Sequence, residues 1–159
     1  MTKRSGLEET QRLELICETI RYCQRIRDGG GPAAVWTKAL REAVHFIWEL
    51  RRGNKTVAAR YRSRASKGLF FGSHHIVYEH VIPLKVVHKA LMDLVDPDPT
   101  EVKAILDRML ITCIVTKEED QKLGRGMPSD WDGIASFVRY DLAGIEVEDN
   151  PDWAFATKD

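Results

Sequence analysis

The sequence predicts an α+β fold that is mostly helical and has a small centre of two strands and a helix. Apolar residues recur every three or four positions near the N-terminus, as they do in amphipathic helices. Two runs rich in β-branched residues, Ile76–Tyr78 and Ile111–Thr116, favour strands. The 159 residues suffice for one domain with its own core. We expect a single domain over 1–159, comprising a helical hairpin with a basic segment (1–67), the strand–strand–helix core (68–124) and a closing segment (125–159).

Composition and charge exclude several classes of protein. The 24 Lys and Arg residues balance the 24 Asp and Glu residues, so no net charge draws the whole molecule to nucleic acid or membrane. The three cysteines have unrelated spacings and form neither a disulfide framework nor a paired zinc motif. The charged N-terminus has no apolar stretch behind it, and no run approaches the roughly 18 apolar residues of a membrane span. We expect a cytoplasmic protein with reduced, buried cysteines and no membrane association.

Two helices form the expected N-terminal hairpin. The first runs from about Leu7 to Asp28 and ends at Gly29–Gly31. Pro32 suits the first turn of a second helix over Pro32–Arg51. The apolar stripe of the first helix comprises Leu13, Ile16, Ile20, Cys23 and Ile26.

A basic segment, Arg51–Lys67, follows the hairpin. We expect a short helix there that ends near Arg64 and is capped by Asn54 or Thr56. Its cations are Arg51, Arg52, Lys55, Arg60, Arg62, Arg64 and Lys67, with Tyr61 between them and no acidic residue. Such a segment is typical of phosphate binding. The alternative is a solvated basic helix that pairs with the acidic tail from Asp141 onward.

The middle of the chain alternates between strands and helices. The first strand, rich in histidine, ends at Pro83, which cannot donate a ladder hydrogen bond. A helix over Leu84–Val95 and a second over Glu101–Met109, capped by Thr100, precede the second strand. Thr116 and Glu119 form a capping box for a helix over Lys117–Leu123, and the remaining chain should form a loop, a short helix and an edge strand.

The histidine-rich stretch His74–Lys85 (HHIVYEHVIPLK) is the strongest candidate for chemistry. Side chains alternate along a strand, which places His75 and Glu79 on one face and His74 and His80 on the other. The adjacent pair Glu79–His80 lies where the strand ends. There is no P-loop, GxSxG elbow or GxGxxG turn elsewhere in the sequence.

The motif EHVIP, Glu79–Pro83, together with ITCIVT and the following KEED, resembles the ββα-metal core of HNH endonucleases. The nuclease domains of colicins show the nearest likeness, which covers about Ile76–Leu123. The resemblance implies an endonuclease that hydrolyses nucleic-acid phosphodiester bonds. Its partner would be nucleic acid, with DNA favoured.

The resemblance assigns a role to each matching residue. His80 would be the general base that takes a proton from water, since an unperturbed imidazole titrates near neutral pH. Glu79 and Asp120 would hold the metal. Carboxylate ligands favour Mg²⁺ or Mn²⁺ over Zn²⁺. The metal would stabilise charge on the scissile phosphate, while cations of Arg60–Lys67 hold the flanking phosphates.

Two positions depart from the family pattern. The family often has an asparagine where this chain has Leu110-Ile111, and the last helix histidine has no counterpart near Gly124. An all-carboxylate site and an inactive copy of the fold are both compatible with these losses. The alternative function is therefore a non-catalytic HNH-like protein that binds DNA or a protein partner.

The other candidate residues also have structural interpretations. His80 could be a structural histidine at a strand end, and His75 either extends the site or lies at the surface. Glu119 suits a helix N-terminus, where the helix dipole favours carboxylates. Zinc held by His75, His80 and Cys113 is a further arrangement, although their spacing does not favour it.

Overall fold

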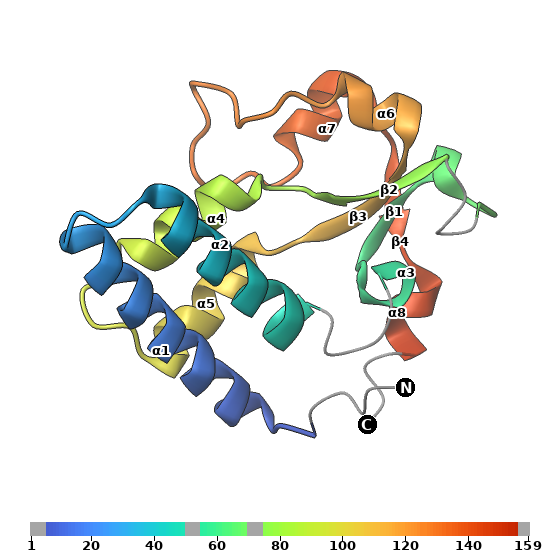
Figure 1. The fold of residues 1–159 in the computed structure, drawn as a ribbon. Helices are drawn as coiled ribbons and strands as arrows, with labels where there is room; N and C mark the ends of the chain where they lie inside the picture. Colours follow the sequence, from blue (N-terminus) through green and yellow to red (C-terminus); the bar gives the residue numbers. More distant parts are fainter. Residues whose placement is uncertain (1–5, 50–54, 70–74, 156–159) are drawn as a thin grey trace. The chain divides into compact units, whose positions relative to one another are not determined.

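The computed structural model describes residues 6–49, 55–69 and 75–155 (Figure 1). The chain divides into two compact units. The helical unit comprises Met1–Arg51 and Leu84–Arg108, and the sheet unit comprises Arg52–Pro83 and Met109–Asp159. The α+β class and the predominance of helix are confirmed. No helix in the described ranges combines the length and apolar character that a membrane span needs.

The helical unit is built on a helical hairpin, as the sequence predicts. Its elements are α1 (Glu9–Asp28), α2 (Ala33–Ala43), the π-helical turn η1 (Val44–Trp48), α4 (Leu84–Met92) and α5 (Pro99–Met109). Helix α1 packs against α2, and α4 packs against both. Polar side chains of α1 also hold the end of α4, because Gln24 and Arg27 donate to the Met92 carbonyl at 3.2 and 3.0 Å.

Two details of the helical unit differ from expectation. The second helix does not continue as regular α-helix to Arg51, because a π-helical turn begins at Val44, where His45 Nδ1 lies 3.1 Å from the buried Glu49 carboxylate. Residues 50 and 51 lie outside the described ranges. Asp98, and not Thr100, caps α5, since its carboxylate accepts from the backbone amides of Thr100 and Glu101.

The sheet unit contains a mixed sheet with the order β2-β3-β1-β4 among its described residues. The strands are β1 (Tyr61–Ser63), β2 (Ile76–His80), β3 (Thr112–Thr116) and β4 (Val147–Asp149). β2 pairs with β3 in antiparallel register, with His80 opposite Thr112, whereas β1 lies parallel to β3. The predicted strands in the middle of the chain are therefore neighbours, and β4 is the expected edge strand.

Helices cover both faces of this sheet (Figure 1). They are α3 (Lys55–Ala58), the 3₁₀ turn η3 (Arg64–Ser66), α6 (Lys117–Lys122), α7 (Val138–Ala143) and α8 (Pro151–Phe155). One face carries a core of Val81, Cys113, Val115, Leu123, Tyr140 and Ile145. The other face carries Ala59, Ile76 and Ile114, with Tyr78 packed against them. Glu79 and His80 occupy adjacent positions of β2, so their side chains project toward different faces.

The predicted helix through Arg64 is wrong. Helix α3 ends at Ala58, and Tyr61–Ser63 enters the sheet between β3 and β4. Backbone pairing with two strands outweighs the weak helical tendency of so short a segment. By contrast, the Thr116–Glu119 capping box of α6 is confirmed.

Candidate functional site

The Glu79 carboxylate is held by contacts within the sheet unit. Its Oε1 lies 2.8 Å from Nη2 of Arg139 on α7, and its Oε2 accepts from the His80 amide at 2.7 Å. Arg139 Nη1 also donates to the carbonyls of His80 and Val81, each at 3.1 Å. The Arg139 side chain is only 6% exposed and that of Glu79 only 18%. This Glu79–Arg139 ion pair therefore fastens α7 to the end of β2.

These contacts do not favour a metal ion at Glu79. Both carboxylate oxygens already accept hydrogen bonds, and a guanidinium does not lose its proton in proteins. A divalent cation on Glu79 would lie close to the fixed, buried charge of Arg139, and repulsion at such short range is strong. In the described part of the chain, no group of three or more His, Cys, Asp or Glu side chains is placed to hold an ion.

His80 takes part in a different arrangement, on the other side of β2. Its ring lies edge-on to the Tyr78 ring, with the centroids 5.6 Å apart. The Lys55 ammonium, from α3, lies 5.8 Å from the centroid of Tyr78. We call these three residues the Lys55–Tyr78–His80 strip. The structure thus separates the expected base from the expected ligand and combines it with an aromatic ring and a cation.

The two candidate carboxylates of α6 have different environments. Glu119 completes the helix cap: its Oε2 accepts from the Thr116 amide at 2.9 Å and from the Ser63 hydroxyl at 2.5 Å. Asp120 is half-buried, and its carboxylate makes no ion pair or hydrogen bond with any other described residue. Glu119 therefore has a structural role that joins α6 to β1.

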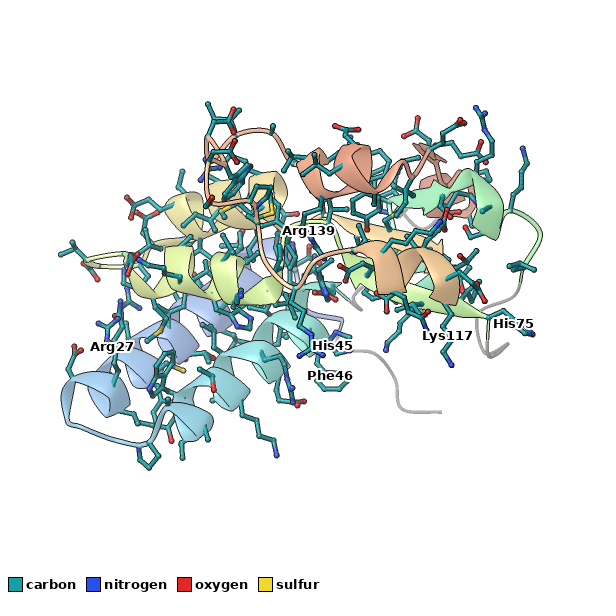
Figure 2. The ribbon with its side chains drawn as sticks, turned by 90° about the horizontal axis from the view of Figure 1, so that it is seen from above. Arg27, His45, Phe46, His75, Lys117 and Arg139 are labelled. Carbon is teal, nitrogen blue, oxygen red and sulfur yellow. The ribbon has the colours of Figure 1, made fainter. Side chains whose placement is uncertain are left out.

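His75 lies just before β2, and its side chain is exposed. Its carbonyl accepts from the amide of Lys117 at 2.9 Å, and Figure 2 shows both residues at the same end of the sheet. His74 lies outside the described residues.

Cys113 is fully buried in the core of the sheet unit. Burial raises the pKa of its thiol to about 12, so the thiol stays protonated at neutral pH. The same burial raises the pKa of the neighbouring Tyr140 phenol. Zinc requires a thiolate, so Cys113 in this environment does not favour the His75–His80–Cys113 arrangement. As the sequence predicts, all three cysteines are buried and free.

The basic segment divides into two groups of residues. Arg64 and Lys67 pair with Glu146 and Glu148, which lie just before and on β4. The acidic C-terminal region thus supplies partners for these two cations, as the alternative interpretation expected. Arg62 donates to the carbonyl of Ser66 at 2.7 Å.

The second group consists of Lys55 and Arg60, whose cationic groups lie close to aromatic rings. Besides Lys55 over Tyr78, the Arg60 guanidinium lies 5.1 Å from the ring centroid of Tyr61 and 5.4 Å from that of Trp153. Arg60 is exposed to solvent. Arg51 and Arg52 lie outside the described residues.

Two features of the structure were not anticipated from the sequence. The first is Arg139, whose signal is a lone cation between the apolar Val138 and Tyr140, because a charge at a buried position needs a partner. The second is a basic groove on the helical unit, whose signal is the helical spacing of Lys38 with Arg41 and of Lys85 with Lys89.

No protein-family model, curated protein or solved structure matches this chain. The function is therefore argued from the chain's own residues.

Proposed function

We propose that the sheet unit binds nucleic acid without cleaving it, through the Lys55–Tyr78–His80 strip. The observation that carries this proposal is the combination of two adjoining aromatic side chains with a cation on one face of the sheet. Aromatic side chains provide surfaces on which nucleobases stack, and lysine displaces counterions from the phosphate backbone.

Arg60 supports the same function. It is exposed and lies against the rings of Tyr61 and Trp153, so a second cation accompanies aromatic surface in this unit. Single-stranded nucleic acid is the class that suits this combination, because its bases are free to stack and its phosphates remain accessible.

We propose binding without cleavage because of the contacts that the Glu79 carboxylate makes. Its carboxylate is committed to Arg139 and to the His80 amide, and this arrangement opposes a divalent ion. The Mg²⁺- or Mn²⁺-dependent endonuclease with His80 as base stays a prediction from the sequence, and these contacts do not favour it.

Binding is tested by fluorescence anisotropy with labelled single-stranded and duplex DNA over a range of salt concentrations. We expect affinity for the single strand to fall with rising salt. Tyr78→Ala should weaken binding by about fivefold or more, since stacking contributes roughly 1–3 kcal/mol per base. Lys55→Ala should also weaken it. Lys67→Ala is the charge-matched control, because Lys67 lies beside Glu148 of β4 and is not part of the strip. Equal effects of Lys55→Ala and Lys67→Ala would contradict the strip.

Catalysis is tested separately by incubating supercoiled plasmid with Mg²⁺ or Mn²⁺. We expect the plasmid to stay intact. Cleavage that EDTA stops and that His80→Ala abolishes would overturn the non-catalytic proposal in favour of the endonuclease.

A further inference from the structure

A groove of about 720 Å³ lies on the helical unit. It is lined by α1, α2 and α4 together with the residue that follows α4. This volume falls within the range of small-molecule sites. The groove thus has the size of a ligand site, and its lining determines which ligand chemistry it would accept.

Most cations of the groove come from one face of α2 and one face of α4. Lys38 and Arg41 are three positions apart on α2, and Lys85 and Lys89 are four apart on α4, so each pair projects from one side of its helix. Arg27 adds a cation from α1; it lies against the end of α4, where it donates to the Met92 carbonyl (Figure 2).

These cations are only partly neutralised. Asp93 is the acidic residue of the lining, and it pairs with Lys89. Arg27 and Arg41 pair with their sequence neighbours Asp28 and Glu42. Lys38 and Lys85 are exposed and form no ion pair with the rest of the described chain. The groove therefore presents a net positive charge and favours an anion.

The apolar residues of the lining indicate which kind of anion the groove would bind. Trp36, Leu84 and Met92 contribute an indole ring and aliphatic surface beside the cations. A simple inorganic anion would leave this surface unused, whereas a nucleotide has both a phosphate and a flat base that stacks on an indole.

We infer that this groove binds a phosphate-bearing nucleobase, either as a free nucleotide or as a unit of a nucleic-acid strand. Lys38 and Lys85 contact the phosphate, and Trp36 contacts the base. The inference does not depend on the strip, because the groove residues all belong to the helical unit.

Isothermal titration calorimetry of the full chain with ATP, inorganic triphosphate and a dT₁₂ oligonucleotide tests the inference. ATP or dT₁₂ should bind saturably and more tightly than triphosphate. Saturable binding of ATP identifies a free nucleotide as a source of the ligand. Binding of dT₁₂ alone identifies a strand in the groove only if Lys38→Glu/Lys85→Glu weakens it. If neither binds, or if triphosphate binds as tightly as ATP, the inference is wrong.

The variant Lys38→Glu/Lys85→Glu should weaken this binding at least tenfold. Its control, Lys117→Glu/Lys122→Glu, changes the net charge equally on α6 of the sheet unit and should leave ATP affinity within twofold. Trp36→Ala should weaken ATP binding but leave triphosphate binding unchanged. Equal losses in the two charge-reversal variants would indicate attraction to overall charge and would overturn the site.

Failure of this inference is distinguishable from failure of the proposed function. Loss of dT₁₂ affinity in Tyr78→Ala, with none in Lys38→Glu/Lys85→Glu, supports the strip and rejects a strand in the groove. The reverse pattern supports the groove and rejects the strip.

Discussion

The Glu79–Arg139 ion pair shows how a motif suited to catalysis can have a structural role. The Glu79–His80 sequence resembles a metal ligand beside a general base. Glu79, however, bonds to an arginine far along the chain, and that arginine also satisfies two backbone carbonyls. Breaking a buried pair is costly because the remaining charge has no compensation.

Arg139→Met should lower the free energy of unfolding by about 3 kcal/mol, because it leaves the mostly buried Glu79 carboxylate without its ion-pair partner. Urea denaturation followed by circular dichroism measures this change. Arg64→Met is the control: its ion pair with Glu146 is largely exposed, so its loss should change stability little. Equal, small effects of both substitutions would show that the buried pair does not contribute as argued.

The single residue Cys113 also makes the free energy of unfolding depend on pH. Its pKa rises from an ordinary value of 9.0 to about 12 in the folded protein. Between these values the unfolded chain loses the thiol proton and the folded protein keeps it, so stability falls as pH rises. The contribution is about 1.4 kcal/mol per pH unit. The wild type should therefore lose stability more steeply than Cys113→Ala from pH 9 to 10.5, as measured by urea denaturation. Parallel pH profiles would contradict the assignment.

At the scale of elements, local signals predicted β2, β3 and α6. β-branched runs and a Thr116–Glu119 capping box depend on residues that are close in sequence. Strand β1 was missed because Tyr61–Ser63 is too short for a clear periodicity and gains its conformation from β3 and β4. The Glu79–Arg139 contact was missed for the same reason: no local pattern reports a partner on α7. The histidines were noticed, but their neighbours in space could not be known.

The cap of α6 gives a test at this scale. Thr116→Ala should lower the free energy of unfolding by about 1 kcal/mol, because its hydroxyl accepts from the Glu119 amide at 3.1 Å. Thermal unfolding monitored by circular dichroism measures the effect. Thr100→Ala is the comparison, since Asp98 provides the cap of α5 and Thr100 is exposed. If Thr100→Ala were the more damaging substitution, the assignment of the caps would be reversed.

At the scale of the whole molecule, the two units alternate along the chain. The segment that carries α4 and most of α5 is inserted between β2 and β3 and belongs to the helical unit. The ends of these strands are nevertheless close, because His80 pairs with Thr112. The sequence predicted both inserted helices, but nothing in it indicated that they would pack in the helical unit.

This topology predicts that the sheet unit folds alone. A chain of residues 52–83 and 109–159, joined by a short Gly/Ser loop in place of the insertion, should unfold cooperatively in urea. Its circular dichroism spectrum should be that of a folded protein. The short gap between paired strands of the sheet makes such a loop sufficient. The same chain with Val115→Asp, which buries a charge in the core, provides the unfolded reference. Indistinguishable spectra for the two chains would mean that the unit requires the helical part.

The position of β1 inside the sheet also has a consequence for the order of folding during synthesis. β1 leaves the ribosome early, but both of its partners, β3 and β4, follow much later in the chain. The α1–α2 hairpin, by contrast, is made of neighbouring segments whose contacts form rapidly. The helical hairpin can therefore form cotranslationally, whereas the unpaired β1 must wait for the C-terminal part of the chain. During this interval an incomplete sheet exposes strand edges to other nascent chains.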